Sequence, residues 1–210
     1  RTFSGTPANG DVGTVSITIT ATDGSGASTA DTFDLVIGNA NDAPTVANPI
    51  VDQAATEDTG FSFQFAANTF ADVDSGDTLT YSTSALPSWL TFTAATRTFS
   101  GTPANGDVGT VNITVTATDG SSASVSDTFD IVVGNANDVP TVANPIADQA
   151  ATEDVAFSFQ FAANTFNDID VGDTLTYSTS SLPSWLAFDA ATRTFSGTPA
   201  NGDVGTVSIT

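Results

Sequence analysis

Two short polar stretches combine oxygen-bearing side chains with a closing proline: Asn39-Ala-Asn-Asp-Ala-Pro44 and Asn135-Ala-Asn-Asp-Val-Pro140. A run of strand-forming residues precedes each of them. Proline has no amide hydrogen to donate and fixes its own φ, so the preceding strand cannot continue through it. Carboxylate and amide oxygens are the ligands that Ca²⁺ prefers in proteins. The two stretches therefore predict calcium-binding joints, each in the linker between one β unit and the next.

Further carboxylates recur in the loops between predicted strands. Alternate loops of an up-and-down sandwich lie at opposite ends, so the loops divide into two groups. The loops expected to face the following joint carry Glu57, Asp58 and Asp107. The loops expected to face the preceding joint carry Asp72, Asp74 and Asp119; Asp77 shares a loop with Asp72 and Asp74 and is not assigned as a ligand. Such a cluster would repel itself without a cation, which favours a metal at each joint.

The elements that position these residues repeat along the chain. Arg-Thr-Phe-Ser-Gly-Thr-Pro begins at Arg1, Arg97 and Arg193, which sets a period of 96 residues (193 − 97). The repeat predicts three parts: residues 1–40 as the C-terminal part of an incomplete repeat, 41–136 as a complete repeat, and 137–210 as the N-terminal part of an incomplete one. We expect either that the protein is longer than 210 residues or that neighbouring molecules complete the partial repeats.

The pattern within one repeat predicts strands throughout. Phe61-Ser-Phe-Gln-Phe65 and its copy at 157–161 alternate apolar and polar residues, which is typical of a strand buried on one face. About seven short strands in roughly 100 residues indicate an all-β, immunoglobulin-like Greek-key sandwich. The predicted strands are Thr45–Val51, Phe61–Phe65, Thr78–Ser82, Trp89–Phe92, Thr98–Phe99, Val111–Ala117 and Thr128–Val133. The Asn105-Gly106 and Asp119-Gly120 turns are expected to use positive φ at glycine.

Composition excludes several classes of function. The net charge is −21, with three Lys and Arg residues in all. Nucleic-acid binding is therefore disfavoured, because it needs a basic surface to contact the phosphates. No Cys or His is present, which excludes zinc sites, thiol nucleophiles and histidine-based triads. No apolar run approaches the ~20 residues that span a bilayer. A glycosidase could use paired carboxylates such as Asp72 and Asp74, but without a supporting cleft the sequence favours a non-enzymatic protein.

Other conspicuous residues have ordinary structural interpretations. Trp89 and Trp185 each lie between Pro-Ser and Leu, where an inward ring would close one end of the sandwich; the alternative is a sugar-stacking platform. The acidic residues expected to be only solvated surface are Asp31, Asp34, Asp127 and Asp130.

The joints, the Asp72-Val-Asp74 loop and the Ala117-Thr-Asp-Gly120 turn together resemble the cadherin repeat. The match is closest to the bacterial cadherin-like (dystroglycan-type) tandem repeats of large secreted or surface adhesins, and it covers the whole chain. For the first joint the resemblance implies these ligands: Asp11, Asn39, Asn41, Asp42, Asp72, Asp74 and Asp119. For the second joint it implies Glu57, Asp107, Asn135, Asn137, Asp138, Asp168 and Asp170, beside Asp58 from the loop argument above.

This sequence departs from vertebrate cadherins in ways that reduce the ligand count. Asn39 and Asn135 replace the first linker aspartate, Ala43 and Val139 replace the last linker asparagine, and only Asp107 remains of an Asp-Arg-Glu loop. We therefore expect one to three Ca²⁺ ions per joint and dissociation constants of ~10⁻⁴–10⁻³ M.

The resemblance implies a calcium-stiffened extender or stalk of an extracellular adhesin or surface filament, secreted or on a bacterial cell surface and connected with biofilm. Its expected partners are neighbouring repeats of the same or identical chains. One alternative is a carbohydrate-binding module that contacts surface glycans. Another is homophilic assembly into fibres through exchanged strands.

Overall fold

The computed structural model describes residues 1–210 as two compact units, Arg1–Gly134 and Asn135–Thr210. The chain has no helix long and apolar enough to cross a membrane.

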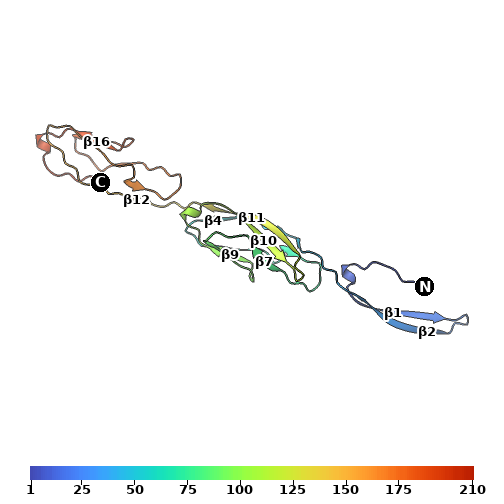
Figure 1. Cartoon of the computed structure of the whole chain (residues 1–210). Helices are drawn as coiled ribbons and strands as arrows, with labels where there is room; N and C mark the ends of the chain where they lie inside the picture. The colour runs from blue at the N-terminus through green and yellow to red at the C-terminus, as the bar shows by residue number, and fades with distance from the viewer. The chain divides into compact units, whose positions relative to one another are not determined.

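The first unit contains a complete β-sandwich, in the light-blue to yellow part of the chain (Figure 1). Its larger sheet has the strand order β4-β11-β10-β7, and a three-stranded sheet has the order β5-β9-β8. A short two-stranded sheet pairs β3 with β6. The bounds are β3 Thr45–Val46, β4 Gln53–Thr56, β5 Phe61–Gln64, β6 Phe70–Ala71, β7 Thr80–Thr83, β8 Leu90–Thr93, β9 Thr98–Gly101, β10 Gly109–Thr118 and β11 Ser124–Gly134.

The core lies between the two larger sheets. Phe129 on β11 is 2% exposed, and its ring centroid lies 5.7 Å from that of Phe63 and 5.6 Å from that of Phe99. Ile113, Val115 and Ile131 are fully buried. These positions alternate along β10 and β11, so one face of the hairpin fills the sandwich while the other meets solvent. The predicted all-β sandwich is confirmed.

The structure differs from the predicted strands at the start of the repeat. The single strand expected over Thr45–Val51 is two strands, because β3 ends at Val46 and β4 begins at Gln53. Pro49 lies between them and has no amide hydrogen for a ladder. β3 pairs antiparallel with β6, and β4 pairs parallel with β11. The complete sandwich therefore has nine labelled strands, two of them only two residues long.

The glycine prediction is wrong. Neither Gly106 nor Gly120 has positive φ. Asn105–Asp107 forms a 3₁₀ turn, η2, in which Asp107 accepts a hydrogen bond from the Ala104 N–H, and Ser122 rather than Gly120 takes the positive φ (74°). The glycine that the fold requires is Gly101 on β9: a Cβ there would lie 1.8 Å from the carbonyl oxygen of Trp89.

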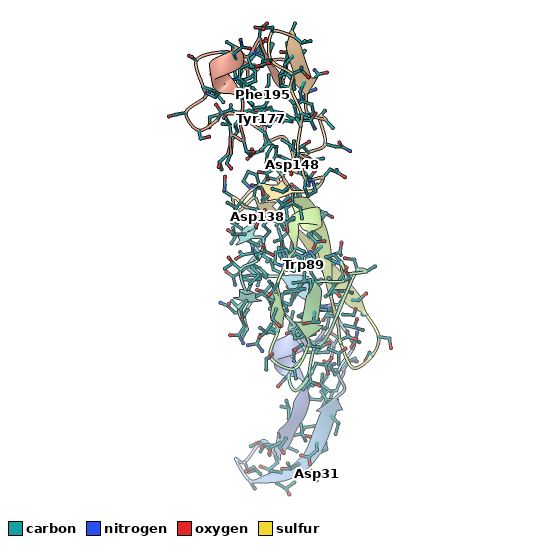
Figure 2. All side chains as sticks on the ribbon, turned by 90° about the vertical axis from the view of Figure 1, so that its left-hand side faces the viewer. Asp31, Trp89, Asp138, Asp148, Tyr177 and Phe195 are labelled. Atoms are coloured by element: carbon teal, nitrogen blue, oxygen red, sulfur yellow. The ribbon has the colours of Figure 1, made fainter.

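Trp89 packs on this core, as predicted. It is half-buried in the complete sandwich, where Figure 2 labels it. Its ring meets Phe61 edge to face with centroids 6.1 Å apart. Trp185 makes the same contact with Phe157 in the second unit, at 6.2 Å.

The N-terminal residues of the first unit form a two-stranded hairpin. After the 3₁₀ turn η1 (Asn9–Asp11), β1 (Gly13–Thr22) pairs antiparallel with β2 (Ser28–Ile37). The pairing runs from Gly13↔Ile37 to Thr22↔Ser28, the register that β10 and β11 have 96 residues later, Gly109↔Val133 to Thr118↔Ser124.

The second unit repeats the first part of the sandwich. β12 pairs with β14, and β13-β16-β15 forms a three-stranded sheet. The bounds are β12 Thr141–Val142, β13 Phe157–Gln160, β14 Phe166–Asn167, β15 Leu186–Asp189, β16 Thr194–Gly197 and η3 Asn201–Asp203. Residues 149–152 and 176–179, the copies of β4 and β7, form no strand here.

Candidate metal centre

Three carboxylates converge in the first unit where the linker 39–44 enters the complete sandwich. One oxygen each of Asp72, Asp77 and Asp119 lies within 4.8 Å of the others. Asp72 and Asp77 come from the loop between β6 and β7, and Asp119 directly follows β10. β10 and β7 are neighbours in one sheet, which brings the two loops to the same end of the sandwich. Asp72 and Asp119, which the sequence predicted to share an end of the sandwich, lie together here, and Asp74 belongs to the same loop as Asp72 and Asp77.

In this loop, Asp72 and Asp74 each have one carboxylate oxygen that accepts a hydrogen bond and one that does not. Asp72 Oδ1 accepts a hydrogen bond from the Asp74 N–H at 2.9 Å, and Asp74 Oδ2 accepts one from the Asp42 N–H at 2.7 Å. Asp72 Oδ2 and Asp74 Oδ1 are buried and have no hydrogen-bond partner. Asp74 is only 5% exposed. Buried anionic oxygens without donors are costly, and a cation is the partner that would satisfy them.

Asp119 is held by its own turn and by the linker. Its Oδ1 accepts hydrogen bonds from the Ser121 and Ala123 N–H groups at 2.9 and 2.8 Å. Its Oδ2 accepts a hydrogen bond from Asn41 Nδ2 at 2.9 Å. The bond from Asn41 is the largest of the effects that lower the pKa of Asp119, so this carboxylate stays ionised.

Asp77 has the opposite environment. Desolvation is the largest cause that raises the pKa of its carboxyl, followed by the negative charges of Asp72, Asp119 and Asp74. The raised pKa means that the cluster resists holding all of its negative charges together.

The linker is tied to this loop by side chains and backbone. Besides the bonds from the Asp42 N–H and Asn41, Asn9 Nδ2 from η1 donates to Asp42 Oδ2 at 2.6 Å. The linker is therefore attached both to the turn before it and to the sandwich after it, all within the first unit.

The second unit repeats the arrangement. Asp170 Oδ2 accepts from the Asp138 N–H at 2.8 Å, and Asp168 Oδ1 accepts from the Asp170 N–H at 3.0 Å. Asp170 Oδ1 is buried without a hydrogen-bond partner. Asp173 joins Asp168 and Asp170 with one oxygen of each within 4.8 Å. The linker bond and the turn of the Asp-x-Asp loop therefore appear twice, at the same positions of the repeat, but the second cluster contains Asp170 where the first contains Asp119.

The remaining predicted ligands are not part of the two carboxylate clusters described above. Asp11 Oδ2 accepts from the Ala8 N–H at 2.9 Å, and Asp107 Oδ2 accepts from the Ala104 N–H at 2.9 Å, so both cap 3₁₀ turns. Glu57 is fully buried, and its N–H donates to the Gly134 carbonyl at 3.1 Å. The predicted ligands with exposed side chains are Asp11, Asn39, Asn41, Asp42, Asp58, Asn135 and Asn137. The ligand roles of these residues stay predictions.

Asp77 and Asp173 belong to the clusters but were not assigned from the sequence. Their signal is the spacing: each follows the second aspartate of the Asp-x-Asp loop by three residues, and its N–H donates to that residue's carbonyl at 3.3 Å. Asn9 was missed because nothing in a single sequence connects η1 with the linker.

Two acidic residues predicted to be plain surface have structural roles. Asp130 is half-buried, and its Oδ1 accepts a hydrogen bond from Asn112 Nδ2 at 2.7 Å, which links β11 to β10. Asp127 is half-buried, and its Oδ2 accepts a hydrogen bond from the Ile50 N–H at 2.6 Å, which attaches β11 to the chain before β4. That prediction is wrong for Asp127 and Asp130, while Asp31 and Asp34 are exposed as expected.

Three comparisons place this geometry among known proteins. The model of a family described as "Putative Ig domain" matches residues 1–38, 43–134 and 139–210. The "Serine-rich adhesin for platelets" of Staphylococcus aureus strain USA300 is 36% identical over 132 residues. That match covers 63% of this chain and 6% of the adhesin, so the chain spans a small part of the length of this relative.

Solved cadherin structures share the fold. Mouse cadherin-23 EC22-24 aligns with a TM-score of 0.63 and 20% identity, covering 89% of this chain and 64% of that one. The PcdhgB3 EC1-4 structure aligns with a TM-score of 0.63 and 18% identity, covering 90% of this chain and 49% of that one. At this identity the likeness shows the fold: an immunoglobulin-like, cadherin-like sandwich.

Proposed function

The chain belongs to the putative Ig domain family, and on that premise we propose that it is a calcium-stiffened structural repeat, an extender or stalk segment of an extracellular adhesin. The protein is a non-enzymatic, load-carrying element whose cofactor is Ca²⁺. Its similarity to a surface adhesin supports the extracellular location.

One observation carries the proposal: each unit has a buried aspartate oxygen without a hydrogen-bond partner, Asp74 Oδ1 and Asp170 Oδ1, inside a group of like charges. Ca²⁺ would supply positive charge and six to eight coordination positions for oxygen ligands. The donor set fits a hard cation, because it consists of carboxylates with amide and backbone oxygens nearby and no nitrogen or sulfur ligand.

The chain's own residues explain how binding would stiffen a joint. Asp74 holds the linker through the Asp42 N–H, and Asp119 holds it through Asn41. Repulsion among Asp72, Asp74, Asp77 and Asp119 acts against this arrangement, so neutralising it stabilises the ordered linker. The ligands in the first unit are Asn41, Asp42, Asp72, Asp74, Asp77 and Asp119, and in the second Asn137, Asp138, Asp168, Asp170 and Asp173.

Small-angle X-ray scattering of the 210-residue chain tests the proposal. At a few millimolar Ca²⁺ we expect a narrower distribution of maximum dimensions than in chelator, with Mg²⁺ at equal ionic strength as the control. The Asp74→Asn, Asp170→Asn double variant should scatter alike in Ca²⁺ and in chelator. Wild-type profiles that do not change when calcium is chelated would reject the stiffening.

The carbohydrate-binding alternative has less support. Its platform would need an exposed aromatic face, whereas Trp89 and Trp185 are half-buried against Phe61 and Phe157.

A further inference from the structure

The three 3₁₀ turns of the chain begin with the same asparagine–glycine pair. In η1 the Asp11 N–H donates to the Ala8 carbonyl at 2.8 Å, and Asp11 Oδ2 accepts from the Ala8 N–H at 2.9 Å. The turns η2 and η3 repeat both hydrogen bonds at the same lengths. The pair therefore recurs in one backbone setting, as Asn9-Gly10, Asn105-Gly106 and Asn201-Gly202.

An asparagine that precedes a glycine can react with its own backbone. The nitrogen of the next peptide group attacks the side-chain carbonyl carbon, and glycine favours this because it has no Cβ to hinder the approach. Gly10 is exposed, and a Cβ placed there would meet no heavy atom within 4 Å. The same is true of Gly106 in the complete sandwich. The glycine of the pair is therefore free of packing that would hold it away from the asparagine.

The turn η1 is also short and exposed. It is three residues long, and the side chains of residues 9–11 all lie in solvent. Segments with few buried contacts open locally at little free-energy cost. The backbone around Asn9 can therefore leave the 3₁₀ conformation for the one in which the Gly10 nitrogen reaches the side chain.

The side chain of Asn9 attaches the linker to this turn. Asn9 Nδ2 donates to Asp42 Oδ2 at 2.6 Å, and the Asp42 N–H donates to Asp74 Oδ2 at 2.7 Å. A carboxylate at position 9 has no N–H to donate, and it is ionised at neutral pH. Two ionised carboxylates at hydrogen-bond distance repel each other. The attachment of the linker therefore depends on the amide form of Asn9.

We propose that Asn9 is a site of spontaneous deamidation, and that its conversion releases the linker 39–44 from η1. The Gly10 nitrogen forms a bond to Cγ of Asn9, the bond from Cγ to Nδ2 breaks, and ammonia leaves with the proton that the Gly10 nitrogen has lost. Water then opens the resulting succinimide ring at one of its two carbonyl carbons, which gives aspartate or isoaspartate. The reaction consumes only water.

Both products remove the attachment. Aspartate places a second carboxylate against Asp42. Isoaspartate carries the main chain through the former side chain, which adds one atom to the backbone inside the turn and disturbs the two hydrogen bonds between Ala8 and Asp11. The joint thereby changes with the age of the protein. The inference does not depend on calcium binding, and its tests are made in chelator, so it can fail while calcium stiffening holds.

Peptide mapping by mass spectrometry tests the reaction. The chain is incubated in chelator for several days at mildly alkaline pH, and deamidation raises the mass of the peptide that contains Asn9 by about one dalton. We expect conversion that becomes faster as the pH rises, because the attacking nitrogen must lose its proton. Gly10→Ala should slow it at least about tenfold, and the turn tolerates this change because φ at Gly10 is not positive and the space there is open.

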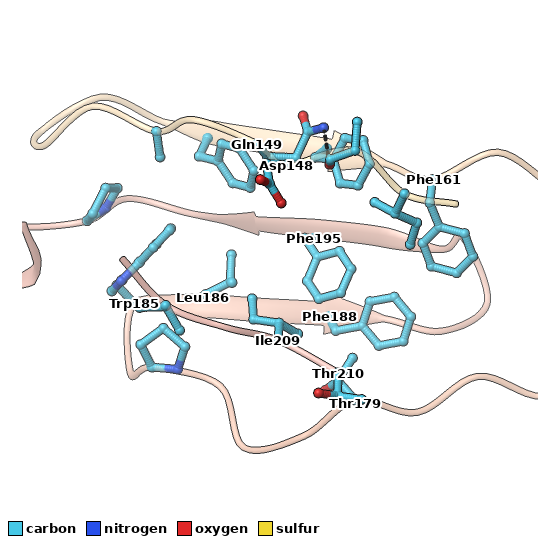
Figure 3. A pocket seen from close by; sticks show the side chains of 18 of the residues that line it. Asp148, Gln149, Phe161, Thr179, Trp185, Leu186, Phe188, Phe195, Ile209 and Thr210 are labelled. Carbon is cyan, nitrogen blue, oxygen red and sulfur yellow. Dashed lines mark hydrogen bonds between the residues drawn. The ribbon is translucent and has the colours of Figure 1, made fainter. Parts of the chain in front are cut away.

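Two other side-chain amides are internal controls. Asn112 Nδ2 donates to Asp130 Oδ1 at 2.7 Å, a hydrogen bond of the same kind, but Asn112 lies within β10 and is followed by Ile113. Gln149 Nε2 donates to a backbone carbonyl at 2.9 Å beside the apolar pocket of the second unit (Figure 3), and its longer side chain would have to close a six-membered ring. Both should stay intact while Asn9 is converted.

Hydrogen exchange at the Asp42 amide tests the release of the linker. In chelator, Asn9→Asp should accelerate this exchange at least about tenfold. Asn9→Ala removes the donor without adding a charge and should accelerate it less. Asn112→Asp is the matched control: it places a carboxylate against Asp130 on the β10–β11 pair and should leave exchange at Asp42 unchanged.

Either experiment can overturn the proposal. The reaction is excluded if Asn9 is converted no faster than Asn112, or equally fast in Gly10→Ala. The release of the linker is excluded if Asn9→Asp leaves exchange at Asp42 at the wild-type rate, or if Asn112→Asp accelerates it as much.

Discussion

Asp74 connects the linker with the acidic loop. One of its oxygens accepts the Asp42 N–H, and the other is buried without a hydrogen-bond partner. Asp72, two residues earlier in the loop, also has one oxygen that accepts a hydrogen bond, from the Asp74 N–H, and one buried oxygen without a partner. At the scale of single residues, these buried oxygens distinguish the cluster from ordinary surface acids such as Asp34.

Asp74→Asn removes one charge and one anionic ligand from the first unit. We expect it to weaken calcium binding there at least about tenfold, since even changes to groups that only support a ligand cost that much. Asp34→Asn removes the same charge from an exposed position on β2 and should leave affinity unchanged. Calorimetric titration measures both, and equal effects would mean that only net charge matters.

The hydrogen bond from Asn41 is the largest cause of the lowered pKa of Asp119. Because the pKa of Asp119 is lowered in the folded chain, this carboxylate stabilises the fold at pH values above the ordinary pKa of 3.8. That contribution to folding stability is lost as the pH falls through the lowered pKa. Asn41→Ala removes the largest cause of the depression, so the pKa of Asp119 should rise toward 3.8. Carboxyl-carbon NMR titration in chelator measures it; Asn48→Ala, in a different hydrogen bond to the Asn68 carbonyl, is the control.

At the scale of the element, β8 pairs with β9, and Trp89 directly precedes β8. Gly101 lies opposite Leu90 in this pair. The close approach of the Trp89 carbonyl leaves no room for a side chain at Gly101, because the nearest atoms belong to backbone that cannot rotate away.

Gly101→Ala should therefore destabilise the complete sandwich by about 3 kcal/mol or more, the upper end of what overpacking costs. Gly106→Ala is the control: a Cβ at Gly106 would meet no heavy atom within 4 Å and the φ there is not positive, so the change should stay within about 0.5 kcal/mol. Urea unfolding followed by Trp fluorescence compares the two. A mild effect at Gly101 would mean that β8 and β9 can move apart.

The strands were predictable where alternation continues over several residues, as in Phe61–Gln64 and in β10. The two-residue strands β3 and β6 were not, because two residues carry no period. The alternation of loops between the two ends of the sandwich was enough to place the Asp-x-Asp loop at the joint. The position of Asp77 was not predictable in this way, because it depends on a turn in which the Asp77 N–H donates to the Asp74 carbonyl. The bond between Asn9 and Asp42 depends on tertiary placement that no local pattern encodes.

At the scale of the whole molecule, the net charge of −21 acts against every compact arrangement of the chain. Sodium chloride screens this repulsion without occupying a site, since the Debye length falls from about 30 Å at 0.01 M to about 10 Å at 0.1 M.

Thermal unfolding separates screening from binding. In chelator the melting temperature of the wild-type chain should rise between about 0.01 and 0.1 M NaCl, as exposed like charges are screened. A few millimolar Ca²⁺ added at 0.1 M NaCl should raise it further, and Mg²⁺ at the same concentration should do so less. Equal shifts with the two cations would indicate general screening in place of a built site.

The most direct measurement is a calcium titration of the isotope-labelled chain followed through its backbone amide resonances. The account predicts saturable shifts, with dissociation constants of ~10⁻⁴–10⁻³ M, at residues 41–42, 72–77 and 119 and at 137–138 and 168–173, while the amides of β10 and β11 stay unmoved. Shifts spread evenly over exposed acids such as Asp31 and Asp34, or none up to about tenfold above that range, would contradict it.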